Sequence, residues 1–523
     1  MIKLSNIAAD TDDKRDRIKY EWKASMRALQ EHVDIINSGV ENWNKWRKEN
    51  KTTKPEFAFV SLRGANLEGA NLSEANLAVA SLAGANLTGA NLRGANLTGG
   101  DLEGANFQGA DLTGANFQGA ILRGADFRLY NFEGANFQAA NLEGANLEGA
   151  NFRGANLRGA DLRLTNFTRV NLERARLMGI NCRGANFEGA QVEKAHLERA
   201  NLEGATLVEA HLRGANFEGV NLRGAVLQGA DLQGAFLRLA NLEGANLEGA
   251  HLEGAHLEGI VLRGAAFQGA NLEGAHLEGA NLTGANLGGV NLERTILEGA
   301  NLEGAHLRGA NLREAVIRRA NLRLVDLQES HLEKTSFEGA HLEGADLRGA
   351  HLEGADLRLA HLEGIHLAVA NLEGAHLESA NLGGAHFEGA NLDGAHLEGA
   401  DLEGAHFGKA HLNSAHFTDT SLRGADFSET DLAGADLTRA NLEGVDLSKA
   451  KSFYKAKLDP NILSAIKIKW PEKLATLLDV RVMDWVIDAA LLEQVKKPDW
   501  HGWPEGKDHR NRTIKPIPAD ANE

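Results

Sequence analysis

The chain has 523 residues, of which 43% are hydrophobic and 24% charged, and its formal net charge is −17 at pH 7. It contains no apolar run long enough to cross a bilayer, so we expect no membrane partner. The single cysteine, Cys182, excludes a disulfide framework and favours a reducing, cytoplasmic location. We expect Cys182 to be a small residue of the core.

Residues 1–54 are predicted to form an N-terminal helical cap. Apolar residues recur at three- and four-residue spacing from 14 to 37, which is typical of an amphipathic helix. A shorter helix, with Trp43 and Trp46 on one side, is expected from 40 to about 48. We expect these helices to cover the first turn of the repeat that follows, and a helix that docks a partner is the alternative.

A repeat of five residues occupies most of the chain. Every fifth position from 57 to 447, here called the central position, is Leu or Phe, except for Cys182, Val192 and Ile317. Alanine usually stands two residues before the central position and Asn, Asp or His one before it. A polar residue and glycine usually follow, as in residues 65–69.

A period of five residues fits neither standard element. On an α-helix successive central residues would be rotated by about 140° and would surround the cylinder, and each glycine would cost roughly 1 kcal/mol. In a flat strand an odd spacing would send successive central residues to opposite faces. The remaining solution is a β-solenoid, in which the chain turns between short strands and every central residue faces one axis.

These quintets resemble the pentapeptide-repeat family, whose consensus is a small residue, Asn or Asp, Leu or Phe, a polar residue and glycine. The resemblance implies a mainly β fold, a right-handed quadrilateral β-helix with four pentapeptides per coil and about 20 coils between residues 55 and 450. Residues whose numbers differ by 20 would then lie above one another. Because the ends of such a stack expose unpaired ladder groups, α-helical caps are expected at both ends.

Phenylalanine is concentrated in two opposite columns of residues spaced by 20, which supports four-sided coils. Neighbours in one column would stack at about the inter-strand spacing of 4.8 Å. The clearest such run is Phe387, Phe407 and Phe427.

The register ends after residue 447. Residues 451–496 are predicted to form a C-terminal helical cap with an apolar stripe that includes Trp485, and a dimer contact is the alternative role of this stripe. Pro, Gly and charged residues dominate 497–523, which predicts an extended or disordered tail. Within this tail Trp500 and Trp503 either dock back or form a short binding motif.

Histidines precede many of the central residues in the second half of the chain, and two opposite columns contain consecutive runs of them. A metal site needs convergent side chains and a second shell, and a straight ladder supplies neither. We therefore predict no metal site and interpret these residues as polar surface residues. If a metal bound, the candidate ligands would be His366, His386, His406, His376, His396 and His416.

Two other surface features are candidates for contact with a partner. The apolar residues Phe236, Ile296 and Val316 precede central positions in one column, which makes them the best candidates for a lateral contact. Acidic residues outnumber basic ones in the repeat, and some pentapeptide-repeat relatives bind DNA gyrase as mimics of the duplex. However, charges of both signs alternate in some columns, which is typical of pairing between coils and of a solubilising surface.

No catalytic constellation is present: the sequence lacks a phosphate-binding loop, a Cys-x-x-Cys pair and a nucleophile elbow. We predict a non-enzymatic rod that acts as a protein-binding scaffold, spacer or structural element, with no cofactor and no direct nucleic-acid binding. One alternative is an acidic DNA mimic that regulates gyrase or another nucleic-acid enzyme. The other is the subunit of a filament or homodimer that assembles through its caps.

Overall fold

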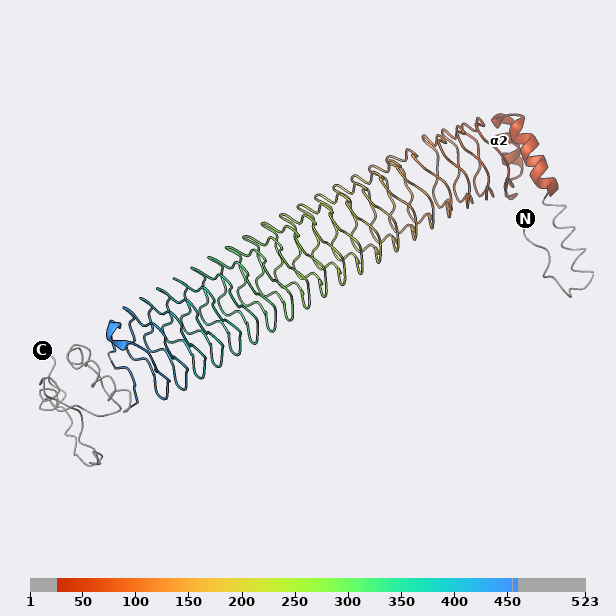
Figure 1. Ribbon diagram of the computed structural model, residues 1–523. Helices are drawn as coiled ribbons and strands as arrows, with labels where there is room; N and C mark the ends of the chain where they lie inside the picture. The colour runs from red at the N-terminus through yellow and green to blue at the C-terminus, as the bar shows by residue number, and fades with distance from the viewer. Residues whose placement is uncertain (1–25, 454, 460–523) are drawn as a thin grey trace, which may run out of the picture. The chain divides into compact units, whose positions relative to one another are not determined.

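The computed structural model describes residues 26–453 and 455–459 (Figure 1). The chain divides into two units, Met1–His256 and Leu257–Glu523, and each is described by itself. The first part of the helix expected from 14 lies outside the described residues. So do the predicted C-terminal helices with Trp485 and the tail with Trp500 and Trp503.

Both units are built from parallel bridges between residues 20 positions apart, so each coil contains four pentapeptides as the sequence predicted. The bridges form at the residue before the central position, for example between Asn66 and Asn86. The N–H of Leu67 donates to the Asn86 carbonyl at 2.7 Å, and the N–H of Asn86 donates to the Ala65 carbonyl at 2.9 Å. Figure 1 shows the successive coils of each unit as stacked loops.

Central residues point into the coils, where they are buried together with the alanines two positions before them. Cys182 is fully buried at a central position, and burial raises the pKa of its thiol. The predicted aromatic stacks are confirmed: ring centroids lie 4.9 Å apart between Phe387 and Phe407, and 5.0 Å apart between Phe407 and Phe427.

Two local devices turn the chain at each corner. The side-chain oxygen of the Asn or Asp before the central residue accepts from the N–H two residues later, as Asn91 does from Arg93 at 3.0 Å. The last residue of the quintet then adopts a left-handed conformation, with φ of 66° at Gly94, which explains the recurring glycine. These two features account for the Asn or Asp before the central residue and for the glycine at the end of the quintet.

The helix α2 (Val40–Glu49) covers the first coil, residues 57–76. Trp43 is fully buried, and its ring N–H donates to the Asn71 carbonyl at 2.9 Å. Asn44 donates to the Gly69 carbonyl at 3.0 Å and accepts from the Asn71 N–H at 2.8 Å. These side chains therefore take the place of a preceding coil.

A preceding helix, described from residue 26 to 37, packs beside α2. His32 on this helix is buried between Trp43, Trp46 and Phe57, and its Nδ1 accepts from the Glu56 N–H at 2.9 Å. Burial lowers the pKa of His32, so the neutral imidazole that this bond requires is the favoured form at pH 7.

The ladder continues beyond residue 447 with its register shifted by one residue. The short 3₁₀ helix η1 (Leu447–Lys449) precedes the shift, after which bridges join Asp431 to Ser452 and Asp436 to Lys457. Phe453 and Leu458 are buried in the shifted register. The inserted residue explains why the five-residue pattern was read as ending at 447.

Among the residues that the structure describes, no helix combines the length and the apolar character that crossing a membrane requires.

Candidate functional site

The ladder is interrupted at one place within residues 56–256, all of which the structure describes. Every bridge of the 20-residue register forms there except Asn106 with Asp126 and Asp111 with Asn131. The N–H groups of Phe107 and Leu112 consequently make none of the ladder bonds that their counterparts in neighbouring coils make. We call this gap, between residues 104–114 and 123–133, the seam.

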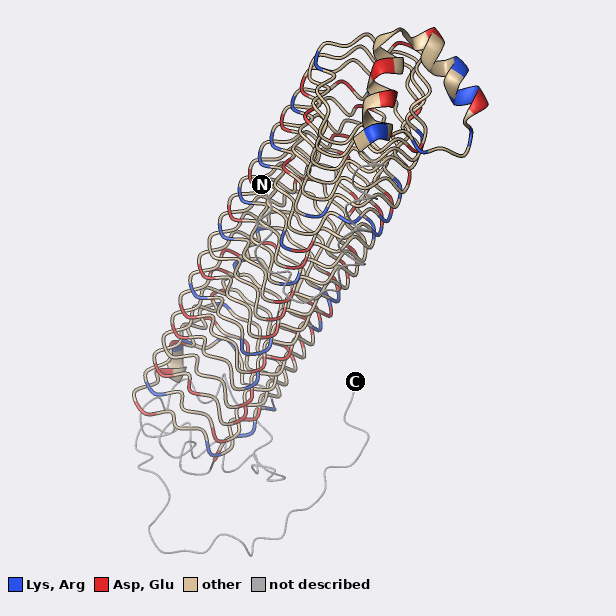
Figure 2. Ribbon diagram, turned by 90° about the vertical axis from the view of Figure 1, so that its right-hand side faces the viewer, with Lys and Arg blue, Asp and Glu red and all other residues tan. Residues whose placement is uncertain are grey.

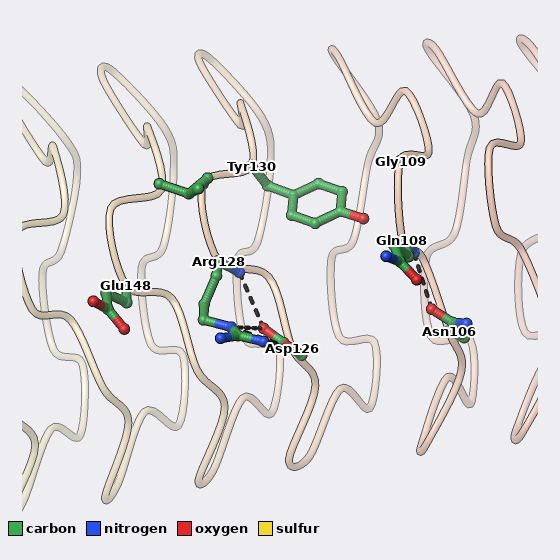
Figure 3. A pocket seen from close by; sticks show the side chains of 8 residues that line it. Asn106, Gln108, Gly109, Asp126, Arg128, Tyr130 and Glu148 are labelled. Atoms are coloured by element: carbon green, nitrogen blue, oxygen red, sulfur yellow. Dashed lines mark hydrogen bonds and ion pairs between the residues drawn. The ribbon is translucent and has the colours of Figure 1, made fainter.

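Tyr130 lies at the centre of the seam. It occupies a position where the coils on either side carry Ala110 and Ala150, and its ring is too large for the space that an alanine fills. Its hydroxyl donates to the carbonyl of Phe107 across the seam. In Figure 3 the ring extends toward the coil that carries Gly109. We infer that Tyr130 holds the two coils apart.

The hydroxyl of Tyr130 stays protonated at neutral pH. Burial raises its pKa above the ordinary value of 10.0, although the N–H groups of Gly109 and Ala110 that face its oxygen act in the opposite direction. It therefore acts as a hydrogen-bond donor to Phe107.

An aromatic cluster supports Tyr130 from inside. Its ring stacks on Phe132 at 5.8 Å and meets Phe127 edge-on at 5.6 Å. Phe132 in turn contacts Phe137 and Phe152. Phe132 and Phe152 lie outside the two columns that hold most of the phenylalanines, so the core is locally rebuilt around the tyrosine.

A polar pocket of about 560 Å³ opens at the seam (Figure 3). Arg128 donates to both carboxylate oxygens of Asp126, with its Nη2 at 2.7 Å from Oδ2, and this bond holds the pKa of Asp126 below its ordinary value. The charges of this pair offset each other. The complete lining is Asn106, Gln108, Gly109, Asp126, Arg128, Leu129, Tyr130 and Glu148.

The seam offers backbone groups for binding and no catalytic machinery. The N–H groups of Phe107 and Leu112 are donors, and the carbonyls of Asp126 and Asn131 are acceptors that lack their ladder partners. The lining contains no histidine, cysteine or serine. Such an arrangement can bind a ligand that supplies complementary peptide groups.

The sequence analysis did not single out Tyr130. The available signal was its size, because it is the one aromatic residue at the alanine position of the repeat between 57 and 447. The column statistics concerned only the central positions.

The structure also places bulky apolar residues at corners where glycine is usual. Leu129 has a φ of 63° and is 81% exposed, and Leu164, Leu324 and Val369 adopt the same left-handed conformation. Such side chains rarely adopt this conformation. The sequence analysis missed these corner residues because it counted apolar residues only at and before the central position.

The predicted lateral patch falls in both units. Phe236 is 46% exposed and stacks on His256 at 4.8 Å in the first unit. Ile296 and Val316 are half-buried and form a bridge with each other in the second unit. A contact role for these three residues stays a prediction.

The histidine columns are stacked as expected from their spacing. His366 lies 4.8 Å from His386, which lies 4.8 Å from His406. In the opposite column His376 lies 5.0 Å from His396, which lies 4.6 Å from His416. A glutamate two residues after many of these histidines faces the ring Nδ1, as at His376 and His396.

Charges of opposite sign pair between successive coils. Glu143 lies 3.5 Å from Arg123 on one side and 3.1 Å from Arg163 on the other. Arg313 and Glu333 form a similar pair at 2.8 Å. Figure 2 shows blue and red positions interspersed along the coils. This pairing reduces the acidic field that mimicry of a duplex requires.

Comparison with known proteins identifies the class. The family model for pentapeptide repeats matches in segments that together run from residue 61 to 451. The chain therefore belongs to the pentapeptide-repeat family, and its coils form the right-handed β-helix of that family. Proteins of this family are generally structural or binding proteins.

Several solved structures are similar to parts of the chain. HetL, a pentapeptide repeat protein involved in heterocyst differentiation regulation from the cyanobacterium Nostoc sp. strain PCC 7120, is 35% identical over 45% of this chain and 88% of its own, with a TM-score of 0.28. QnrB1, a plasmid-mediated fluoroquinolone resistance protein, is 22% identical over 42% of this chain and 93% of its own, with a TM-score of 0.20. Among curated protein sequences none matches the chain.

Proposed function

We propose that the chain is a non-enzymatic protein-binding scaffold and that the seam is its recognition site. The supporting observation is the pair of missing bridges around Tyr130, which leaves backbone donors and acceptors available in the middle of an otherwise regular ladder. An extended polypeptide segment is the ligand that best supplies complementary groups, because its backbone alternates N–H and C=O at the same spacing as a strand.

Backbone contacts would dominate this recognition. The Asp126 and Arg128 charges offset each other, and Glu148 leaves the lining with one net negative charge, which is too little to select a strongly charged ligand. Tyr130 and Leu129 supply apolar contact area beside the polar groups. The expected ligand is therefore a largely uncharged extended segment of a partner protein.

A pair of tyrosine variants tests the proposal. Extended peptides selected from a displayed library for binding to the wild-type chain would be assayed against Y130A and Y130F. Y130A should close the seam and weaken binding by at least about tenfold, whereas Y130F keeps the ring and should retain most of the affinity. Equal affinity for the wild type and Y130A, or a failure to select any peptide, would contradict the proposal.

The two alternative functions, a DNA mimic and an assembling subunit, are tested separately. As a DNA mimic the chain would inhibit supercoiling by gyrase at micromolar concentration, and the pairing of Glu143 with Arg123 and Arg163 argues against this role. As a filament or dimer subunit the chain would assemble as its concentration rises, and light scattering would show the increase in its mass. A lack of inhibition and a strictly monomeric mass would dismiss these two roles.

We also propose the finer organisation of the chain. A helical cap of 1–54 precedes a β-solenoid of about 20 coils over 55–450. The sequence predicted a second helical cap over 451–496, but the ladder continues to Lys457, so we propose this cap only for the rest of that segment. The bonds from α2 to Asn71 support the first cap. The single buried Cys182 supports a reducing, cytoplasmic location.

A further inference from the structure

A cluster with metal-binding chemistry lies in the second unit, on two successive coils. The Nδ1 of His396 is 3.3 Å from Oε1 of Glu398, and the Nδ1 of His416 on the next coil is 3.8 Å from the same oxygen. The ligand atoms of these three residues all lie within 4.8 Å of one another. The two imidazoles stay stacked, with ring centroids 4.6 Å apart and ring planes 7° from parallel, and both Nδ1 atoms lie near the same carboxylate oxygen.

The carboxylate of Glu398 has a spare ligand atom. Its Oε2 is shielded from solvent and has no hydrogen-bond partner, and a buried carboxylate oxygen without a partner is costly. The side chains of His396, Glu398 and His416 are half-buried, so one side of the cluster still faces solvent. The Oε2 atoms of other glutamates, such as Glu343 and Glu378, are shielded in the same way, so the second histidine, His416, is what distinguishes this cluster.

We propose that His396, Glu398 and His416 bind a divalent transition-metal ion of the zinc type. Imidazole nitrogen and carboxylate oxygen are ligands that Zn²⁺ accepts, and three protein ligands leave a fourth position for water. Metal–ligand bonds of about 2.1 Å in a tetrahedron place ligand atoms about 3.4 Å apart. The observed 3.3 Å and 3.8 Å lie close to this spacing, and the two stacked rings would turn toward the ion to bind it in their ring planes.

The opposite histidine column provides a matched comparison. His386 stacks on His406 at 4.8 Å, and its Nδ1 lies 3.2 Å from Glu388. Nevertheless, within the described residues these three side chains form no cluster of the kind found at His396. His386 can therefore be replaced as a control that removes a stacked histidine without removing a proposed ligand.

The test is a Zn²⁺ titration of the full chain in competition with a chromophoric chelator. The wild type should bind one more equivalent at micromolar concentration than H396N, H416N and E398Q, whereas H386N should match the wild type. Asparagine occupies the corresponding position at Asn381 and Asn391, so the histidine variants should keep the fold, and circular dichroism checks this. The chain contains a further cluster of the same kind, formed by Glu258, His276 and Glu278. Because all variants keep this cluster, the test compares the number of Zn²⁺ equivalents that each variant binds with the number that the wild type binds.

Co²⁺ supplies a second readout that a purely structural role would not change. Tetrahedral binding at this site would give visible absorption bands in the wild type and H386N that H416N and E398Q lack. Equal Zn²⁺ equivalents in the wild type and the ligand variants would overturn the proposal. A loss in H386N as large as in H416N would also overturn it.

Discussion

The first coil and the seam both expose the edge of a hydrogen-bonded ladder, but only the first coil is covered. At the first coil, Trp43 and Asn44 of α2 bond to Asn71 and Gly69, where a preceding coil would have bonded. At the seam, Tyr130 supplies a single hydroxyl, which donates to a carbonyl that already accepts from Ala110. Several side chains that match the hydrogen-bonding groups of the ladder can thus replace a coil, whereas the single hydroxyl of Tyr130 cannot.

The largest loss of stability is expected at the first coil, which α2 covers. W43A removes a fully buried indole and its bond to Asn71, which should destabilise the first coils by about 3–5 kcal/mol. Thermal unfolding would measure the loss, with W46A as the control because Trp46 is only partly buried. An equal loss of stability in both variants would mean that α2 stabilises the first coil by general packing and not by the bond of Trp43 to Asn71.

N44A should have the next effect. It removes two hydrogen bonds to the backbone of the first coil, worth roughly 1–3 kcal/mol together. The Asn71 amide should exchange with solvent faster, as the amides at the seam are expected to do, while the amide of Leu92 in the following coil stays protected. No change at Asn71 would contradict the role assigned to α2.

The side of the Tyr130 coil that faces away from the seam is tightly packed. A Cβ added at Gly149 would lie 2.7 Å from Cδ2 of Leu129, whereas one added at Gly144 would meet nothing within 4 Å. Both glycines have positive φ, so G144A should cost about 1 kcal/mol from backbone strain alone. G149A should lower the melting temperature further, and equal losses would show that Leu129 moves aside freely.

The ion pair of Asp126 and Arg128 in the pocket should contribute least to the stability of the fold. The folded pKa of Asp126 lies below its unfolded value of 3.8, mainly because Arg128 donates to it. Its stabilising contribution is therefore present above about pH 4 and is lost as the pH falls further. The stability difference between the wild type and D126N should shrink from pH 6 to pH 3, and a difference that grew on acidification would contradict this.

Periodicity explains why the coils of each unit could be predicted from the sequence. The fivefold spacing places the Leu and Phe residues inside. The resemblance to pentapeptide-repeat proteins implies the 20-residue register, which the columns of phenylalanine support and the stack of Phe387, Phe407 and Phe427 confirms. Such regularities depend on the backbone, which every repeat shares.

The candidate sites could be predicted only in part, because they depend on single departures from the repeat. The seam depends on the size of Tyr130 relative to the space left by its neighbours. The sequence analysis named His396 and His416 as candidate ligands but predicted no metal site, because the proposed site also depends on how the Glu398 side chain turns between two coils. The continuation through Phe453 was hidden because one inserted residue shifts the period.

The most direct test is hydrogen exchange at the amides of Phe107 and Leu112 in the wild type and in Y130A. If Tyr130 holds the coils apart, both amides exchange quickly in the wild type and at least about tenfold more slowly in Y130A, while the Phe117 amide is protected in both. Strong protection of Phe107 and Leu112 in the wild type, unchanged by Y130A, would mean that the ladder is continuous and that no seam exists.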